Sequence, residues 1–340
     1  METNCYYNES IAFFYNQSKK IMAKDWEPYY IIVMILGMIV SIVAILANLL
    51  VIVAVYIEKK FHYPLYYLIA NLAASDFFAG ISYLYLLFHT GPNTSKLSLS
   101  GWMLRQAMLD TSLTASVGNL LAIAVERHLT VMKMEVHSSM STRRVFLAIA
   151  FIWFIAILMG AVPSMGWHCM CNIASCSNMA PLYSNSYVIF WTALNLLIFF
   201  IMVVLYSRIL YYVKQKTKRM SKHTSLPAKR KKMTMKLLKT VCIVLGVFVI
   251  CWTPGLVLLF LDVFCTTSCD LNAPEKFFLI LAEINSALNP IIYSYRDKNM
   301  WKAFKKIICI CRHAGSRIQQ NNSGKLEDAQ QNGKGAEKPS

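Results

Sequence analysis

The sequence has little charge, and acidic residues are especially scarce. Only 15% of its 340 residues are charged, and 17 Asp and Glu stand against 34 Lys and Arg. An average soluble domain carries about 25% charged residues. Hydrophobic residues make up 56% of this chain, and its mean hydropathy is +0.45. These proportions exclude an ordinary soluble protein and indicate a chain that crosses a membrane several times.

Signatures of enzymes and transporters are also missing. The seven histidines are scattered, and neither HExxH nor GxSxG occurs in the sequence. A membrane transporter is the distant alternative, but it would be expected to show repeated halves with interrupted helices. No such internal repeat is present. We therefore predict a membrane protein that is not an enzyme.

Long apolar runs are the dominant feature of the chain. Windows of about 20 or more apolar residues, the length that crosses hydrocarbon, cover 29–56, 66–88, 102–131, 145–167, 186–212, 237–264 and 274–295. The predicted fold class is an all-α membrane protein, a seven-transmembrane helix bundle with a short amphipathic helix after span seven. The predicted divisions are an extracellular cap (1–28), the bundle (29–296), an interfacial helix (297–311) and a disordered cytoplasmic tail (312–340).

The basic residues predict the orientation of the chain. Of the 34 Lys and Arg, 28 follow the first, third, fifth or seventh span or lie at their ends. The other six are Lys19, Lys20, Lys24, Lys96, Arg105 and Lys276. By the positive-inside rule the amino terminus is outside, which predicts a multi-pass plasma-membrane protein. The sequons at Asn8, Asn16 and Asn93 lie on that outer side and are expected to be glycosylated. The basic excess faces anionic lipid and an acidic partner, so it requires no nucleic acid.

The cysteines divide by side of the membrane. Cys5, Cys169, Cys171, Cys176, Cys265 and Cys269 lie outside, where disulfides are expected in preference to zinc binding, although their pairing stays open. Cys309 and Cys311 follow a stretch, Met300 to Ile308, whose apolar residues share one helical face. This pattern predicts an interfacial helix with palmitoyl anchors. Two buried free thiols are the alternative.

The third apolar window holds charges at both ends. Arg105 and Asp110 lie near its outer end, and Glu126 and Arg127 near its inner end. At 1.5 Å per residue the two arginines are separated by about 33 Å, close to the thickness of the hydrocarbon core. Asp110 is five residues from Arg105, a spacing that does not favour a pair within one helix. An arginine without a local partner at the mouth of a pocket is suited to binding phosphate.

One motif occurs in each predicted span, in order. The motifs are Asn48, Leu72 to Asp76, Glu126-Arg127-His128, Trp153, Tyr206, Cys251-Trp252-Thr253-Pro254 and Asn289-Pro290-Ile291-Ile292-Tyr293. Over nearly its whole length the chain resembles the rhodopsin-like G-protein-coupled receptors. Within them, NLAASDFFAG, HTGPNT, LRQAMLDTSLTAS, CSNMAPLYS, CWTPGLVLL and NPIIYSYRD look like the lysophosphatidic acid receptors. An opsin would carry lysine where this chain has Glu283, an acid to which we assign no role.

The resemblance implies a receptor for lysophosphatidic acid, which has a phosphate, a hydroxyl and one acyl tail. Such a ligand needs fixed cations near the outer surface and an apolar cavity beneath them. The family's head-group residues carry over onto Arg105, Gln106, Lys276, Lys20 and Tyr15, and its pocket residues onto Asp110 and Trp191. Alternatives stay open for three of these. Lys276 could form a surface ion pair with Glu275, Lys20 could be a solvated loop charge, and Asp110 could hold the ligand hydroxyl or brace the cavity.

Gln106 separates related ligands. The resemblance places Glu at this position in sphingosine-phosphate receptors, where a carboxylate can neutralise the ligand's ammonium. An amide cannot, and an unpaired ammonium in a pocket of low dielectric constant is costly. Gln106 therefore favours lysophosphatidic acid, with sphingosine-1-phosphate or another lysolipid as the alternative.

The resemblance also implies the disulfide pairs, because span three lacks the usual cysteine at its outer end, as in the lysophospholipid branch. The implied pairs are Cys169 with Cys176, Cys5 with Cys171, and Cys265 with Cys269.

The activation switch implied by the resemblance consists of Glu126, Arg127, Tyr206, Trp252, Pro254, Asn289, Pro290 and Tyr293. Ligand binding would favour the state in which span six swings outward at its inner end. Lys229 to Lys239 contains no acid, so Arg127 depends on Glu126 and we expect appreciable basal signalling.

Asp76, Ser116 and Asn285 resemble a sodium pocket, and a protonated Asp76 bonded to Asn289 is the alternative. No other cofactor is expected. The implied partners are heterotrimeric G proteins of the inhibitory, phospholipase-coupled and Rho-coupled classes, with arrestins, receptor kinases and membrane lipid.

Overall fold

Helices make up most of the part of the chain that the structure describes. The computed structural model describes residues 5–18, 20, 22–133, 140–220, 228–264 and 272–309, without the side chains of 213–214, 216–220, 228–242, 272–276 and 296. The long helices are α2 (Pro28–Ile57), α3 (Pro64–Phe88), α4 (Leu99–Lys133), α5 (Thr142–Ala161), α6 (Asn185–Met220), α7 (Ala228–Phe264) and α8 (Asn272–Arg296). Shorter elements are α1 (Ile11–Gln17) and the 3-10 helices η1 (Lys59–Phe61), η2 (Gly91–Lys96) and η3 (Ile173–Ser175). Each long helix holds an apolar stretch that could cross a membrane, and residues 298–309 form a helix after α8. The predicted fold class is confirmed.

Proline marks several helix boundaries. Pro28 and Pro64 occupy the first turns of α2 and α3, where the missing N–H costs nothing. The fourth predicted window, 145–167, runs past the end of α5, because residues 162–166 are turns. Pro163 lies in these turns and cannot donate the backbone hydrogen bond that would continue the helix. The turn is apolar, so hydropathy alone did not reveal it.

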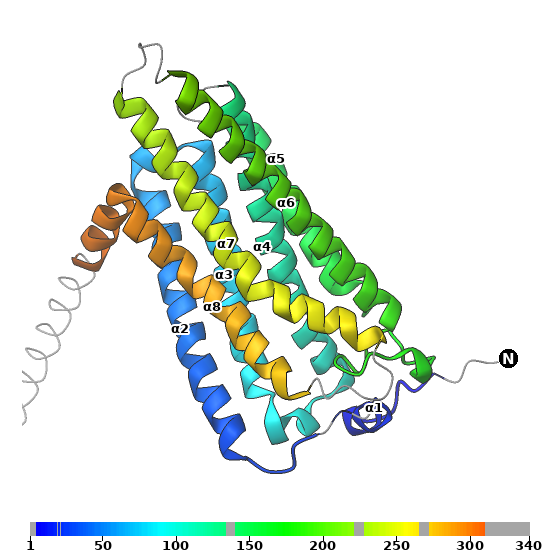
Figure 1. The fold of residues 1–340 in the computed structure, drawn as a ribbon. Helices are drawn as coiled ribbons and strands as arrows, with labels where there is room; N and C mark the ends of the chain where they lie inside the picture. Colours follow the sequence, from blue (N-terminus) through cyan, green and yellow to red (C-terminus); the bar gives the residue numbers. More distant parts are fainter. Residues whose placement is uncertain are drawn as a thin grey trace, which may run out of the picture.

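The seven long helices form one bundle around α4. This helix contacts α3, α5, α6 and α7, while α2 and α8 contact each other and close the other side. In Figure 1, α1 lies across one end of the bundle, and the orange helix after α8 turns away at the opposite end. The candidate ligand site and the inner switch residues therefore lie towards opposite ends of the same bundle.

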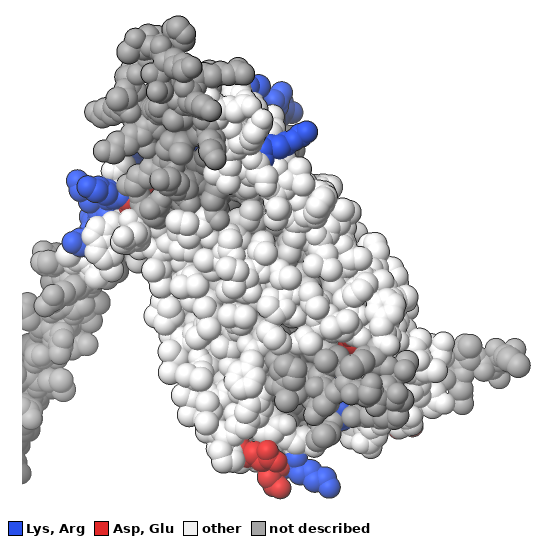
Figure 2. All heavy atoms as spheres, viewed as in Figure 1, with Lys and Arg blue, Asp and Glu red and all other residues white. Residues whose placement is uncertain are grey.

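The bundle exposes apolar side chains and buries polar ones. Leu46, Phe151, Phe200 and Ile250 are all exposed on the outside of their helices, while 26 polar or charged residues are buried in the described part of the chain. Figure 2 shows a broad belt without Lys, Arg, Asp or Glu at the surface, with charged spheres near the two ends. Apolar surface of this extent suits contact with lipid, and buried polar groups are where function is expected.

A glycine allows α4 and α5 to approach closely. A Cβ atom added to Gly160 would lie 2.3 Å from Thr111 Oγ1 and 2.6 Å from the carbonyl oxygen of Ala107. No side chain fits at that separation. Gly160 therefore sets the distance between α5 and the amino-terminal half of α4, the half that carries Arg105.

Candidate functional site

A cavity of about 500 Å³ lies at the α1 end of the bundle. Its walls come from α2, α3, α4, α6, α7 and α8, and residues of the α1 segment and of the loop before α6 cover it. Of the predicted ligand residues, the cavity is lined by Tyr15, Lys20, Arg105, Gln106, Asp110 and Trp191. Its volume falls in the range of pockets that bind small molecules.

Arg105 is a buried cation in the wall of the cavity. Only 6% of it is exposed. Its Nη1 donates to the carbonyl oxygen of His89 at 3.0 Å, and its guanidinium carbon lies 5.5 Å from the centre of the Trp102 ring. Among the described residues, its Nε has no hydrogen-bond partner and no carboxylate forms a salt bridge with it. Such a charge is costly to bury unless an anion compensates it.

Lys20 adds to the positive potential at this end of the cavity, and Tyr15 lies beside it. Trp102 Nε1 donates to the Tyr15 hydroxyl at 3.3 Å, and Lys20 Nζ lies 5.9 Å from the centre of the Tyr15 ring. Burial raises the pKa of Tyr15, but the charges of Lys20 and Arg105 outweigh it, so that the net pKa is lowered. The field that favours a phenolate at Tyr15 also favours a bound anion.

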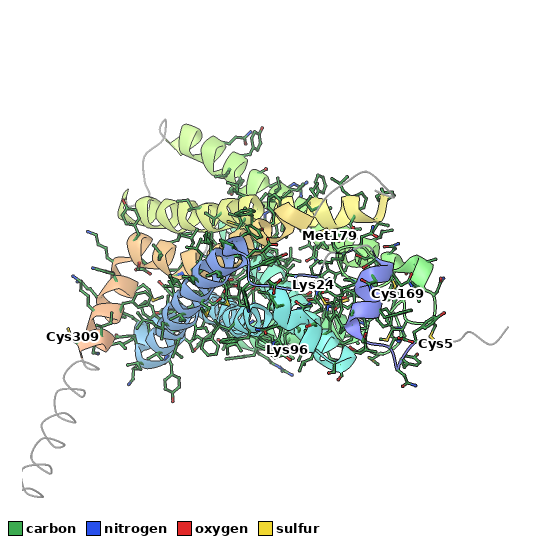
Figure 3. The ribbon with its side chains drawn as sticks, turned by 90° about the horizontal axis from the view of Figure 1, so that it is seen from below. Cys5, Lys24, Lys96, Cys169, Met179 and Cys309 are labelled. Carbon is green, nitrogen blue, oxygen red and sulfur yellow. A yellow bond between two sulfur atoms is a disulfide. The ribbon has the colours of Figure 1, made fainter. Side chains whose placement is uncertain are left out.

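Disulfides hold the amino-terminal segment and the loop over the cavity. The structure contains Cys5–Cys171 and Cys169–Cys176, and Tyr6 N donates to the carbonyl oxygen of Met170 at 3.0 Å. Figure 3 labels Cys5 and Cys169 beside α1. These are two of the three pairs that the resemblance implies. Cys265 and Cys269 lie outside the described residues, and Lys276 lies in α8 with its side chain undescribed.

Asp110 braces the cavity wall through two tyrosines that the sequence did not indicate. Its Oδ2 accepts hydrogen bonds from the hydroxyls of Tyr183 at 2.9 Å and Tyr187 at 3.3 Å. Burial and then the nearby Asp110 raise the pKa of Tyr183, so Tyr183 keeps its proton and remains a donor. The Tyr187 hydroxyl lies 2.8 Å from the carbonyl oxygen of Met159. Asp110 is thus hydrogen-bonded to two residues of the cavity wall, as the bracing alternative requires.

The floor of the cavity is mainly apolar but contains buried polar atoms. Trp191 and Trp252 line the cavity, and the Nε1 atom of each lacks a hydrogen-bond partner in the part of the chain that is described. Glu283 also lines it, is 4% exposed, and has no partner for Oε1. Trp252 packs against Phe248, with ring centres 6.0 Å apart, and lies two residues before Pro254 in α7.

A polar cluster lies beneath this floor around Asp76. Its carboxylate accepts hydrogen bonds from Asn289 Nδ2 at 2.7 Å, Ser116 Oγ at 3.1 Å and Ser286 Oγ at 3.2 Å. Ser116 and Ser286 also line the cavity, so each links the cavity to the Asp76 carboxylate through its hydroxyl. Asn285, predicted as a member of this cluster, is buried, and neither of its amide atoms has a hydrogen-bond partner among the described residues. Its neighbour Ser286 was not predicted.

The inner end of α4 carries a buried ion pair. Arg127 Nε and Glu126 Oε2 form a salt bridge, and Thr130 Oγ1 donates to Glu126 Oε1 at 2.9 Å. Tyr206 and Tyr293 are buried, and Pro290 lies within α8. Sequence reasoning found Glu126 and Arg127 but missed Thr130, whose position one turn after Glu126 was the available signal.

The helix at 298–309 is attached to the inner ends of α2 and α3. Tyr66 donates to Asp297 at 2.7 Å, and Lys306 Nζ lies 3.0 Å from Glu58 Oε1. Cys309 is exposed, and Cys311 lies outside the described residues. Of the predicted glycosylation sites, Asn8 and Asn16 are exposed and Asn93 is half-buried.

A seven-helix bundle with a ligand cavity at one end and a buried acid–arginine pair at the other is the arrangement of a G-protein-coupled receptor. The family model of the seven-transmembrane receptors of the rhodopsin family matches residues 47–293. Lysophosphatidic acid receptor 1-A of Xenopus laevis and lysophosphatidic acid receptor 1 of Homo sapiens are each 61% identical over 311 residues, 92% of this chain and 85% of theirs. Lysophosphatidic acid receptor 3 of Rattus norvegicus is 52% identical over 310 residues, 91% of this chain and 88% of its own.

The chain therefore belongs to the rhodopsin family of seven-transmembrane receptors and, within it, to the lysophosphatidic acid receptors. It is a multi-pass membrane receptor and not an enzyme, which confirms these predictions from the sequence.

Proposed function

We propose that this chain is a plasma-membrane receptor, with its amino terminus outside, that lysophosphatidic acid activates and that signals through heterotrimeric G proteins. The observation that carries the proposal is a buried arginine at the mouth of an apolar cavity. Arg105 has no carboxylate partner among the described side chains, and Tyr15 and Lys20 lie on the same side of the cavity. The relatives' names, which are those of lysophosphatidic acid receptors, support the same ligand.

The phosphate would bind to Arg105, Gln106, Lys20, Tyr15 and Lys276. The buried guanidinium is compensated when an anion arrives, and it can form two parallel hydrogen bonds to a phosphate. Each hydrogen bond to a charged group contributes about 1.5–3 kcal/mol. Loss of Arg105 is therefore expected to weaken the response by roughly 10- to 100-fold or more.

The acyl tail would occupy the apolar part of the cavity, between Leu113, Leu256 and Trp191. The ligand hydroxyl would approach Asp110, which two tyrosines already orient. Gln106 would select the ligand, because an amide cannot neutralise the ammonium of sphingosine-1-phosphate.

Activation would be a shift between two arrangements of the helices. A ligand favours the arrangement to which it binds more tightly. We propose that α7 moves outward at its inner end about the Trp252 and Pro254 region, where the proline removes a backbone hydrogen bond. Arg127 would then leave Glu126 and meet Tyr206 and Tyr293, which opens a site for a G protein of the inhibitory, phospholipase-coupled or Rho-coupled class. Arrestins and receptor kinases are proposed as further partners.

The cluster around Asp76 is suited to a sodium ion. It offers a carboxylate and hydroxyl oxygens, the ligands that hard cations prefer. The side-chain oxygen of Asn285 is buried and has no hydrogen-bond partner in the described part of the chain. Asp76, Ser116 and Asn285 would hold the ion, with Ser286 as a further candidate. A bound cation would supply the countercharge for a buried carboxylate and so stabilise the resting arrangement.

The proposal is tested by ligand-response curves in cells that lack such receptors. The intact chain, Arg105→Ala and Gln106→Glu are compared with lysophosphatidic acid and sphingosine-1-phosphate. We expect the intact chain to respond only to lysophosphatidic acid, Arg105→Ala to lose the response, and Gln106→Glu to admit the sphingolipid. Lys96→Ala is the matched control, because Lys96 is an exposed cation that bonds to Asn93 and does not line the cavity. A receptor present at the cell surface that answers neither lipid would contradict the ligand assignment.

A further inference from the structure

A chain of hydrogen bonds connects Lys20 to Asp262, a buried acid near the outer end of α7. We propose that this relay makes Asp262 a positioning residue, which holds Lys20 in place for the ligand phosphate and ties the loop over the cavity to α7. The inference rests on the proposed function in one respect, that Lys20 binds phosphate. The relay itself is a property of the receptor without ligand.

The relay runs through a single peptide group. Lys20 Nζ donates to the carbonyl oxygen of Met179 at 2.6 Å, and the N–H on the other side of that peptide, from Ala180, donates to Ser177 Oγ at 2.9 Å. The Ser177 hydroxyl donates to Asp262 Oδ2 at 2.7 Å. Every donor therefore points in the same direction, from the ammonium towards the carboxylate. Figure 3 labels Met179 close to the yellow outer half of α7.

The charges at the two ends reinforce the relay. The peptide dipole has its negative end at the ammonium and its positive end towards the carboxylate, which is the favourable orientation at both ends. Chains of hydrogen bonds polarise one another, and they do so more strongly in a low-dielectric interior. Ser177 is fully buried and Asp262 is 3% exposed. Lys20 and Asp262 thus behave as a charge pair that acts through a peptide and a hydroxyl.

Asp262 also fixes the shape of the loop. Its Oδ2 accepts a second hydrogen bond, from Met179 N at 3.1 Å. Ser177 N bonds to the carbonyl oxygen of Tyr183, the tyrosine that braces Asp110. The amino-terminal cap, the loop over the cavity and α7 therefore meet at Met179, with Asp262 as the anchor on the helix that is proposed to move.

The Lys20 ammonium has three N–H donors, so it can bond to a ligand phosphate while it keeps its bond to the Met179 carbonyl. A phosphate can therefore bind to an ammonium that the relay already holds in position, and loss of Asp262 would release that ammonium from its position. Phosphate binding at the cap in this way depends on α7, although α7 contributes no cation to the head-group set.

A double-mutant cycle tests the relay. Dissociation constants for lysophosphatidic acid are measured by direct binding to Lys20→Ala, Asp262→Ala and the double variant. We expect each single change to weaken binding about 5- to 20-fold, since charged hydrogen bonds are lost. The double variant should be little weaker than the worse single variant, because both changes break one relay. Independent residues would give fold-changes that multiply.

Three further variants separate charge from packing. Asp262→Asn keeps an acceptor oxygen and nearly the same volume, so this variant is expected to reach the cell surface. Because it removes the charge, its combination with Lys20→Ala should show the same non-additive loss of binding as Asp262→Ala. Ser177→Ala interrupts the relay but leaves the bond from Met179 N, and it should also remove most of the effect of Lys20→Ala. Lys96→Ala combined with Asp262→Asn is the matched control, and its fold-changes should multiply.

The same cycle is measured without ligand, as shifts in melting temperature of the purified receptor. Non-additive shifts for Lys20→Ala and Asp262→Asn are expected. Additive shifts in melting temperature, or multiplying fold-changes in binding, would overturn the relay while a normal response to lysophosphatidic acid left the proposed function standing. If the intact chain did not bind the lipid, the proposed function would fail and the melting temperatures would still decide the relay.

Discussion

The buried acids in the cavity wall and beneath its floor differ in how their charges are accommodated. Asp110 receives two tyrosine hydroxyls, and Asp76 receives three polar hydrogen bonds. Glu283 lines the same cavity, yet its Oε1 has no partner among the described residues. Burying an uncompensated carboxylate is unfavourable. An unfavourable residue of this kind is expected to limit stability.

Replacement of Glu283 by its neutral analogue tests this idea. Glu283→Gln is expected to leave the free energy of unfolding unchanged or to raise it by about 1 kcal/mol, because an amide costs less to bury than a charge. The measurement is the melting temperature of the purified receptor without ligand. Asp25→Asn, at an exposed outer acid, is the control and should change nothing. A clear loss of stability in Glu283→Gln would mean that the carboxyl group has a stabilising role.

The hydrogen bonds of Asp110 give a second prediction at this scale. Tyr183→Phe removes one donor from a buried carboxylate, which typically costs about 1–3 kcal/mol. We expect a lower melting temperature and a several-fold weaker response to lysophosphatidic acid. Tyr56→Phe removes the hydroxyl of a tyrosine that is 83% exposed and serves as the control. Equal behaviour of the two variants would contradict a bracing role.

Single residues of the site could be predicted from the sequence where a charged side chain occurs within an apolar window. Arg105 and Asp110 drew attention because charges are rare in an apolar window. The partners Tyr183 and Ser286 carried no such signal, since tyrosine and serine are common in membrane helices and loops. Asp262 occupies the end of an apolar run, where an acid is unremarkable, and only the fold places it against Ser177 and Met179.

At the scale of helices, the contact at Gly160 sets the spacing of α4 and α5. Gly160→Ala would place a Cβ within 2.6 Å of a backbone oxygen of α4, so the two helices must separate. We expect a loss of about 1–3 kcal/mol in stability, as in other overpacked sites. Gly246→Ala is the control: its Cβ would meet nothing within 4 Å, and alanine favours the helix. Melting temperatures and surface expression are measured for both, and an equal result would remove the steric argument.

The helices themselves were largely predictable, because membrane spans follow from the length of apolar runs. The exception was the end of α5, where an apolar turn containing Pro163 continued the hydropathy signal beyond the helix. The position of α1 over the cavity was not predictable from hydropathy. It depends on Cys5–Cys171 and on contacts such as Trp102 with Tyr15, which join distant parts of the chain.

At the scale of the whole molecule, α4 connects the ligand cavity to the inner surface. Arg105, Asp110 and Ser116 face the cavity from its outer half, and Glu126 and Arg127 form the ion pair near its inner end. Between them lies the Asp76 cluster, which also includes Asn289 of α8. A change in the arrangement of the helices therefore alters the contacts of the cavity, of the Asp76 cluster and of the ion pair together. The balance between resting and active states depends on all three.

The ion pair between Glu126 and Arg127 gives a prediction for the level of signalling without ligand. The first turns of α7, Lys229 to Lys239, contain no acid. This stretch therefore offers Arg127 no carboxylate from another helix. The resting state then depends on Glu126, which Thr130 orients. We expect basal G-protein signalling above that of receptor-free cells at equal surface expression.

Glu126→Gln should raise this basal signalling about 2- to 10-fold, since a population shift of that size needs only about 0.4–1.4 kcal/mol. Thr130→Val, which removes one hydrogen bond and keeps the charge pair, should raise it less. Basal signalling equal to that of receptor-free cells, or a Glu126→Gln variant no more active than the intact chain, would show that other contacts hold the resting state.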